Sequence, residues 1–345
     1  MRRAGHRRGA MRSVLSAALL TLFAASGAAS AATPAKLAYV TGLAGTHPQV
    51  HVANADGSGA VGIGAGVDAL ISPDGASVAI VTPYTRRGTS LVVRPAGGGG
   101  AARTLVRTGD SIGPLVWSPD GTRLAVVVNT KRLVAIDVAT GAQHTIARGQ
   151  IQGASFSPDG SQVAYARSRS ARLLAPVNVF VAQADGSSAH AITHDGRSLY
   201  PLWGSSRIAY THERLRRADA PVYQLRVMRP NGSSVRQLTH LRIPRLLSGL
   251  TATAWSADGS RLLAEYGGQD TSEAWTVDVH SGRAQDLTGR FDGVIGAALS
   301  ADGSAVLVQR GYFDEPKHQS VATIPFGGGR ATVLVRHGSE PSWGG

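Results

Sequence analysis

Three carboxylates that lie far apart in the chain occupy equivalent places in successive segments. Asp68, Asp292 and Glu340 each precede a short apolar run. If these runs are strands around one axis, the carboxylates meet at one mouth of a central channel. Oxygen ligands of this kind suit a hard cation such as Ca²⁺, and like charges without a cation raise one another's pKa. We therefore predict a cation or polar-ligand site there, with Ca²⁺ as the only candidate cofactor. The alternative is that the three side chains point into bulk water.

Arginines are concentrated in the middle of the chain, on segments expected to be long loops. A guanidinium group presents a planar fork that matches carboxylate or phosphate, so arginines on neighbouring loops can hold an anionic ligand. The alternative is that these charges only keep the protein soluble. The predicted ligand-binding residues are Arg167, Arg169, Arg172, Arg214, Arg216, Arg217, Arg242 and Arg245.

Two patterns imitate catalytic motifs. Gly109-Asp-Ser-Ile-Gly113 has the Gly-x-Ser-x-Gly spacing of a nucleophile elbow, but Pro114 opens a strand where a helix must follow. His47 and His51 are four residues apart in a loop that enters a strand, so they do not share the helical face that a zinc peptidase requires. The sequence therefore indicates no catalytic residue, and we expect a protein that is not an enzyme.

The elements that position these residues recur along nearly the whole chain. Seven times an apolar run ends in a hydrophobic or aromatic anchor, at intervals of 39 to 52 residues, and five anchors lead into Ser-Pro-Asp-Gly or Ser-Ala-Asp-Gly. Asp-Gly between apolar runs predicts a hairpin, and a period of about 40 to 50 residues is that of a four-stranded propeller blade. We expect the Ser and Asp side chains to bond to local backbone groups, and the Trp anchors to pack between blades. The anchors are Ile71, Trp117, Phe156, Trp203, Trp255, Leu299 and Trp343.

The two ends of the chain are each incomplete in a way that the other end supplies. Residues 36–64 are typical of the second, third and fourth strands of a blade, and Glu340 to Gly344 of a first strand with nothing after it. Pairing them would close a ring and cover the sheet edges that otherwise invite aggregation. We predict an all-β fold, a seven-bladed β-propeller closed by the N- and C-terminal strands in one blade, with residues 32–345 as a single domain. Six blades is the alternative if the terminal strand does not pair.

The repeats resemble those of a known family. The (W/F)-S-P-D-G element is followed by strands such as Lys36-Leu-Ala-Tyr-Val40, and the chain also contains Ala184-Asp-Gly-Ser187 and Gln237-Leu-Thr239. Over residues 36–345 this pattern resembles the TolB-like, WD-repeat-like β-propeller repeats. The resemblance implies a propeller that is six-bladed in TolB itself. It also implies a role as a binding platform, an envelope-complex component or an accessory domain of a serine peptidase.

Two classes of function remain open at this point. The first is non-catalytic binding of a protein, a peptide or an anionic envelope polymer through the variable loops of one face. The second is a propeller enzyme, a lyase or hydrolase, that acts at the mouth of the central channel. We favour binding, because no set of residues shows a catalytic geometry in the sequence. Nucleic acid is not expected as a partner, because the arginines lack interleaved aromatic residues for stacking.

The first 31 residues have the composition of a secretory signal peptide. Met1 to Arg12 holds five arginines and no acid, Val14 to Ala25 is apolar, and Ala29-Ser-Ala31 fits a cleavage site. The apolar run is too short to span a bilayer. The chain has no cysteine, which excludes disulfides and a lipid anchor on an N-terminal Cys. We expect an exported monomer, periplasmic or extracellular, whose formal charge falls from +13 to +8 when the five leader arginines are removed.

Overall fold

The computed structural model describes residues 36–45, 47–172, 175–215, 221–268, 271–289, 293–311 and 318–344. Within these ranges the secondary structure consists of strands joined by turns and loops, without a helix. The all-β fold class is therefore confirmed. The strands form antiparallel groups of four in chain order, and one group combines the two ends of the chain. Four of these groups are separate sheets, whereas the three groups between residues 198 and 336 are joined into one 12-stranded sheet by single parallel pairs, Tyr223 with Gly249 and Glu273 with Val294.

We call the consecutive groups units 1 to 6, and the group that combines the two ends the seam unit. Unit 1 holds β4 (Asp68–Ile71), β5 (Ser77–Val81), β6 (Thr89–Pro95) and β7 (Arg103–Thr108); unit 2 holds β8 (Ile112–Trp117), β9 (Arg123–Val128), β10 (Arg132–Asp137) and β11 (Gln143–Arg148). Unit 3 holds β12 (Gln150–Phe156), β13 (Gln162–Ser168), β14 (Asn178–Gln183) and β15 (His190–Ala191); unit 4 holds β16 (Ser198–Trp203), β17 (Ile208–Arg214), β18 (Val222–Met228) and β19 (Arg236–Gln237). Unit 5 holds β20 (Leu247–Trp255), β21 (Arg261–Gly268), β22 (Ser272–Asp278) and β23 (Ala284–Asp286); unit 6 holds β24 (Val294–Leu299), β25 (Ala305–Arg310), β26 (Ser320–Pro325) and β27 (Thr332–Arg336). The seam unit holds β28 (Gly338–Gly344), β1 (Lys36–Thr41), β2 (Gln49–Asn54) and β3 (Val61–Ala65).

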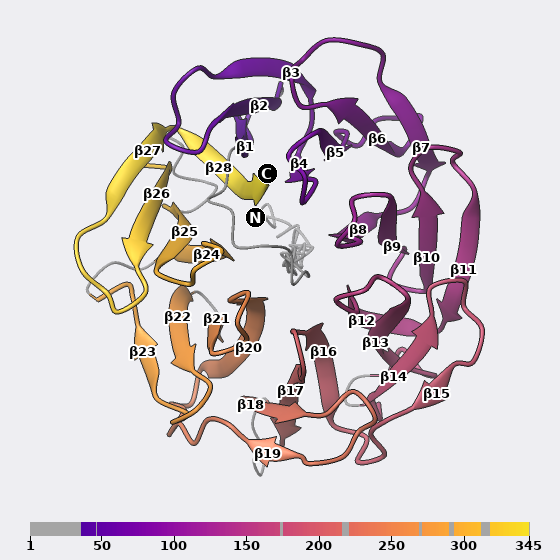
Figure 1. Cartoon of the computed structure of the whole chain (residues 1–345), viewed down its shortest axis with the longest axis vertical. Coiled ribbons are helices and arrows are strands. Elements are labelled where there is room, and N and C mark those ends of the chain that lie inside the picture. The colour runs from indigo at the N-terminus through magenta and orange to yellow at the C-terminus, as the bar shows by residue number, and fades with distance from the viewer. Residues whose placement is uncertain are drawn as a thin grey trace, which may run out of the picture.

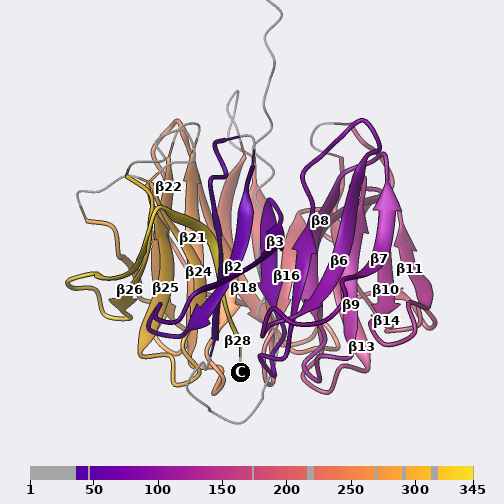
Figure 2. The ribbon, with the colours of Figure 1, turned by 90° about the horizontal axis from the view of Figure 1, so that it is seen from above.

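The units surround a central axis in the manner of propeller blades (Figure 1). The first strand of each unit, such as β4, β16 or β28, lies nearest to the axis, and the last lies at the rim. In side view the strands run between two faces, and β28 ends at the lower one (Figure 2). The inner strands end at this face, which we call the turn face, because tight turns lead from it into the second strands. The opposite end, the loop face, carries the connections between second and third strands and those between units.

The Ser-x-Asp-Gly turns are held by the side chains of their own Ser and Asp. In the turn after β8, Ser118 Oγ donates a hydrogen bond to Asp120 Oδ1 at 2.5 Å and accepts one from the backbone N–H of Arg123 at 2.9 Å. Asp120 Oδ1 also accepts from the N–H of Thr122 at 3.1 Å, and Gly121 adopts a φ of +68° that glycine allows. The same bonds recur in the other four turns of this type. The predicted local role of these Ser and Asp side chains is confirmed.

Tryptophan anchors fasten neighbouring units to one another near the axis. The indole Nε1 of Trp117 donates to the carbonyl of Leu70 in unit 1 at 2.9 Å, and that of Trp255 donates to the carbonyl of Leu202 in unit 4 at 3.0 Å. These two side chains and that of Trp203 are buried. The indoles of Trp117 and Trp255 therefore combine a large apolar contact with a satisfied N–H, as buried Trp requires. The prediction that these anchors pack between units is confirmed.

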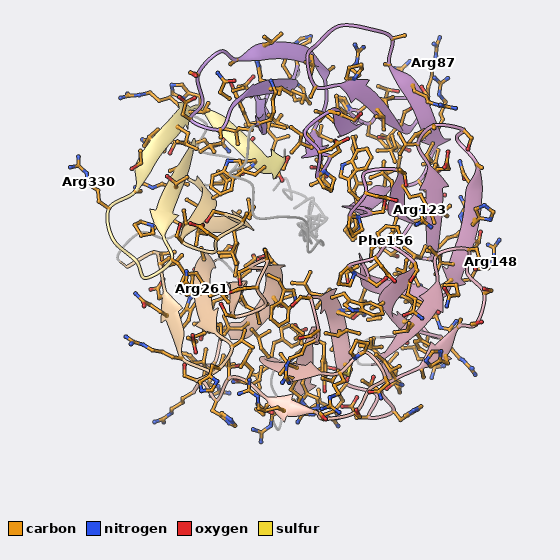
Figure 3. All side chains as sticks on the ribbon, viewed as in Figure 1. Arg87, Arg123, Arg148, Phe156, Arg261 and Arg330 are labelled. Carbon is orange, nitrogen blue, oxygen red and sulfur yellow. The ribbon has the colours of Figure 1, made fainter. Side chains whose placement is uncertain are left out.

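Two arginines make a further link between units at the turn face. Arg123 in unit 2 lies over the ring of Phe156 in unit 3, with its Cζ 5.9 Å from the ring centre (Figure 3). Its Nη2 also donates to the carbonyl of Gly160 at 2.9 Å. Arg261 in unit 5 repeats this arrangement over Phe326 of unit 6, at 4.8 Å. Such cation–π contacts stabilise the packing of the units, so these arginines are structural.

The seam unit joins the two ends of the chain. β28 pairs antiparallel with β1, and Trp343 lies opposite Leu37, so the expected pairing of the terminal strands is present. Ser342 Oγ donates to the carbonyl of Ala69 and accepts from the N–H of Ile71, both at 3.1 Å. β28 is therefore also bonded to β4 of unit 1. Trp343 differs from the other Trp anchors, because its side chain is only partly buried.

On its other side the seam unit packs against unit 6. Gly57 lies in the turn between β2 and β3 with a φ of +84°, and a Cβ there would lie 2.4 Å from the carbonyl oxygen of Leu334 in β27. Leu37 and Tyr39 of β1 share a buried cluster with Leu307 of β25. The seam unit thus contacts both of its neighbours around the ring.

Candidate functional site

Five of the predicted ligand-binding arginines lie on or next to loops of the loop face. Arg169 and Arg172 lie between β13 and β14, Arg214 ends β17, and Arg242 and Arg245 lie between β19 and β20. All five side chains are exposed. They come from units 3 and 4, which are neighbours in the ring (Figure 1). We call these five residues the arginine arc.

The other predicted arginines are placed differently. Arg167 lies over the ring of Phe180 in β14, with its Cζ 4.2 Å from the ring centre, and its side chain is partly buried. Its guanidinium therefore packs against its own sheet, unlike the five exposed guanidinium groups of the arginine arc. Arg216, Arg217 and Asp292, which were also predicted as site residues, lie outside the described residues.

Exposed apolar side chains accompany the arginine arc. Leu215 follows Arg214 directly and is 45% exposed, and Leu246 follows Arg245 directly and is 77% exposed. Tyr84, on a loop of unit 1 at the same face, is 67% exposed. An exposed leucine beside an exposed arginine offers a partner both apolar contact and charge, which is the composition of a protein-binding surface.

Asp68, at the start of the inner strand β4, is a buried carboxylate with an unused oxygen. Its side chain is 7% exposed, and its Oδ1 is buried without a hydrogen-bond partner. Burial raises the pKa of Asp68 to about 6, and the hydrogen bond with the N–H of Ala69 opposes that rise. A buried polar atom without a partner costs free energy, so such an atom in a native fold points to a missing donor.

Glu340 lies beside Asp68 across the seam. The bonds of Ser342 to β4 fix the relative level of the two inner strands, which run in the same direction, and Glu340 comes level with Asp68. Burial, and then the negative charges of Asp68 and Glu265, raise the pKa of Glu340 to about 8. The structure therefore brings two of the three predicted carboxylates together. The cation site that the sequence predicts there stays a prediction.

The backbone at Glu340 is held in an uncommon conformation. Its φ is +46°, and it lies with Pro341 in a bulge where the register of β28 against β1 shifts. Its N–H donates to Gln309 Oε1 of β25 at 2.8 Å. A positive φ costs a residue with a side chain about 1–2 kcal/mol. The hydrogen bond to Gln309 of unit 6 helps to hold Glu340 in that conformation.

A third buried acid, Glu265, extends this group toward unit 5. Glu265 lies on β21 with 5% of its side chain exposed, and Ser272 Oγ donates to its Oε1. Burial raises the pKa of Glu265, and the bond from Ser272 opposes that rise. Its negative charge acts on Glu340, as noted above. We call Asp68, Glu265 and Glu340 the inner acids.

Tyr200 repeats in unit 4 the backbone arrangement of Glu340. Its φ is +48°, Pro201 follows it, and the register of β16 against β17 shifts there. Burial, and then the charges of Glu213 and Glu265, raise the pKa of its hydroxyl. The inner strands of unit 4 and of the seam unit thus use the same bulge to place a polar side chain near buried acids.

The chemistry open to the inner acids follows from their pKa values. Near pH 7 Asp68 is ionised and Glu340 holds a proton. Two carboxyl groups whose environments separate their pKa values can exchange a proton with a ligand or bind a cation together. Among the residues that the structure describes, no three His, Cys, Asp or Glu side chains are placed to hold one metal ion.

A separate polar network lies at the loop face of unit 4. His212 Nε2 lies 3.3 Å from Asp195 Oδ2, and Arg226 Nη1 lies 3.8 Å from the same oxygen. Burial opposes ionisation of Asp195, but hydrogen bonds from His212, the N–H of Arg197 and Ser198 Oγ lower its pKa. Asp195 therefore stays ionised and holds β17 and β18 together beneath the arginine arc.

The two motif-like patterns take up structural positions. Ser111 is exposed and precedes β8, the strand that contains Pro114. His51 stacks on Tyr39 with ring centres 5.2 Å apart, and its Nε2 is hydrogen-bonded to Thr41 Oγ1 at 2.9 Å. The contacts of His51 are those of a residue that builds the seam unit.

Sequence reasoning did not identify Glu265 or its neutral counterpart Gln309, although the repeats contain a signal for both. In each unit the anchor of the first strand lies opposite one residue of the second strand, and the position of interest is three residues after that one. It is occupied by Val81, Val127 and Ala166 in units 1 to 3. The same position carries Glu265 in unit 5 and Gln309 in unit 6. Unit 4 carries the buried Thr211 there, so a buried polar residue at this position distinguishes units 4 to 6 from units 1 to 3.

Comparisons with solved structures support the fold. No protein-family profile and no curated protein sequence matches the chain. TolB from Acinetobacter baumannii superposes with a TM-score of 0.54 at 17% identity, over 90% of this chain and 66% of that one. The β-propeller domain of the Trilobed protease from Pyrococcus furiosus gives a TM-score of 0.65 at 12% identity, over 89% of this chain and 94% of that domain. An oligogalacturonate lyase in complex with manganese gives 0.59 at 14% identity, over 89% and 86% of the two chains. The chain therefore has a TolB-like β-propeller fold, and it spans about two thirds of the TolB structure.

Proposed function

We propose that this protein is an exported, non-catalytic binding propeller. In this proposal residues 32–345 form one seven-bladed β-propeller, closed by the pairing of β28 with β1, and the chain acts as a monomer. Its loop face recognises a protein, a peptide or an anionic envelope polymer. The observation that carries the proposal is the arginine arc, with exposed leucines beside it, on neighbouring loops of units 3 and 4.

The chemistry of this surface favours an acidic ligand. Guanidinium groups bind carboxylates and phosphates through paired hydrogen bonds. Leu215 and Leu246 add exposed apolar area, so a ligand with both acidic and apolar groups fits better than a simple anion. Because the charges are exposed, salt screens their attraction, and binding should weaken as salt rises.

We expect the double substitution Arg214→Glu and Arg242→Glu to weaken binding of an acidic polymer about tenfold. Each exposed charge pair contributes about 0.7 kcal/mol, and 1.4 kcal/mol is a factor of ten in affinity. Titration calorimetry with poly-L-glutamate at low salt measures the effect. Arg87→Glu is the control, because Arg87 is exposed on a loop of the same face in unit 1, outside the arc (Figure 3). Equal binding by the double variant and the unchanged protein would remove the arc from consideration.

Export is the second part of the proposal. The proposed signal peptide, residues 1–31, lies outside the described residues. No described helix is long and apolar enough to cross a membrane. We expect the protein recovered outside the cytoplasm of an expressing bacterium to begin at Ala32, which N-terminal sequencing or intact mass measures. Recovery of an uncleaved chain in the cytoplasm alone would contradict export.

A propeller enzyme is the second candidate, and one observation favours it. Asp68 and Glu340 differ in protonation near pH 7, as a general base and a general acid must. The oligogalacturonate lyase with a similar fold shows that such a ring can carry an enzyme. Assays for lyase and hydrolase turnover with the unchanged protein and an Asp68→Asn variant separate the two functions. Turnover that Asp68→Asn abolishes and the arginine reversals leave intact would favour the enzyme over the binding protein.

A further inference from the structure

Among the inner acids, Asp68 lacks a hydrogen-bond donor for one of its buried oxygens. Asp68 Oδ1 is buried without a partner, and Ser272 supplies a donor only to Glu265 Oε1. The ion pairs that join Asp195 to His212 and Arg226 do not involve the inner acids. Asp68 and Glu265 lie close enough to Glu340 for their negative charges to act on it.

The missing hydrogen-bond donor at Asp68 determines what kind of ligand fits. An ionised carboxylate only accepts hydrogen bonds, so its missing partner must be a donor. An ammonium or guanidinium group brings several N–H donors together with a positive charge. A metal ion fits less well, because Ca²⁺ takes six to eight oxygen ligands. The described residues, by contrast, do not place even three acid or imidazole side chains around one point.

We propose that Asp68 and Glu340 bind the ammonium or guanidinium group of a ligand at the seam, close to the central axis, and that Glu265 adds negative potential. Glu340 is partly exposed and belongs to an inner strand, so the ligand approaches from the axis (Figure 1). The site is independent of the arginine arc. It takes the opposite charge, and it is formed by other units.

Ligand binding at this site depends on pH. The charged groups that raise the pKa of Glu340 are Asp68 of β4 and Glu265 of β21. Its other neighbours are Gln309 of β25, which is neutral, and Tyr39 of β1, which lies opposite the bulge. An ammonium group binds best when both Asp68 and Glu340 are ionised. Since the pKa of Glu340 is raised to about 8, a ligand bound near pH 7 displaces a proton. Amine affinity should therefore rise from pH 5 to pH 9, and binding should release a proton near neutrality.

Titration calorimetry on the whole mature protein tests the site. The probes are 1,4-diaminobutane, N-methylguanidinium and CaCl₂, each at about pH 8.5 and about pH 5.5, on either side of the raised pKa values. We expect heat from the amine or the guanidinium at the higher pH. Asp68→Asn and Glu340→Gln should each weaken that binding about tenfold or more. Asp110→Asn is the matched control, because Asp110 is an exposed carboxylate between β7 and β8 on the loop face.

Each outcome decides the proposal. Heat with CaCl₂ and none with the organic cations would replace it by a metal site. No heat with any probe at the higher pH, or equal binding by all variants, would overturn it. Melting temperatures of the variants exclude misfolding as the cause of lost binding. Glu340→Gln removes a charge from an acidic group, so it should keep the fold and still fail to bind.

Discussion

A chain that ends at His337, and so lacks β28, is expected to lose its stable monomeric fold. Removing β28 uncovers β1 along its whole length and exposes Leu37, which is fully buried in the complete chain. It also removes the bonds of Ser342 to the carbonyl of Ala69 and the N–H of Ile71. Together these losses should cost about 5 kcal/mol or more, comparable with the whole stability of a domain. Circular dichroism and size-exclusion chromatography should show a lower melting temperature and aggregation through the open edge.

Two controls connect that effect with the seam. A synthetic peptide of residues 338–344, added in excess, should restore monomer and melting temperature, because it can pair with β1 as β28 does. Ser342→Ala removes only the two hydrogen bonds and should cost about 1–3 kcal/mol, without aggregation. A truncated chain with the same melting temperature as the complete protein would show that the pairing of β28 with β1 contributes little to stability.

The sequence predicts the strands and turns well, because both depend on local chemistry that repeats. In each Ser-x-Asp-Gly turn, the Ser, the Asp and a glycine with positive φ satisfy one another within six residues, as Ser118 and Asp120 do. The pairing of the chain ends was also predictable, because each end lacked the strand that the other provides. The bulges at Tyr200 and Glu340 were not predicted. At each of them a residue with positive φ precedes a proline where the register of the inner strand shifts, and no repeated motif of the sequence marks the two positions.

The candidate sites were less accessible to sequence reasoning than the fold. Sorting charges by loop placed Arg169, Arg214 and Arg242 on one face, because exposed side chains follow directly from loop position. The same reasoning could not show that Arg167 folds back onto Phe180, since that contact depends on the neighbouring strand. Glu265 escaped notice because it sits inside a strand, and the register that brings its charge to Glu340 is set by the ring as a whole.

The arginine arc and the inner acids make opposite demands on a ligand. The arc is exposed on loops, so its charges are screened by salt and their effect on stability is small. Among the inner acids Asp68 and Glu265 are buried and Glu340 is partly exposed. The lower dielectric around buried charges makes their repulsion larger, so that repulsion affects the stability of the fold. A charge change at the arc should therefore alter binding alone, whereas a charge change at the inner acids should alter folding as well.

Stability without a bound cation is expected to fall as pH rises from about 5 to about 9, and Glu340→Gln should remove much of that fall. The pKa of Asp68 rises from an ordinary 3.8 to about 6, and that of Glu340 from 4.5 to about 8. The native state therefore holds more protons than the unfolded state in this range, so raising pH favours unfolding. For Asp68 alone the rise corresponds to about 3 kcal/mol. The turn aspartates, such as Asp302, have a lowered pKa and act only in acid, as pH falls below about 4.

Urea unfolding at a series of pH values measures this effect. We expect the free energy of unfolding of the unchanged protein to peak near pH 5 and to decline by several kcal/mol toward pH 9, with Asp68 contributing up to about pH 6 and Glu340 up to about pH 8. Glu340→Gln should match it near pH 5 and exceed it near pH 9, because a neutral side chain no longer repels Asp68. Asp110→Asn should follow the unchanged protein throughout, since Asp110 is exposed. Parallel curves for the unchanged protein and Glu340→Gln above pH 7 would mean that Glu340 already has a counter-charge at the seam, and the repulsion inferred among the inner acids would then be wrong.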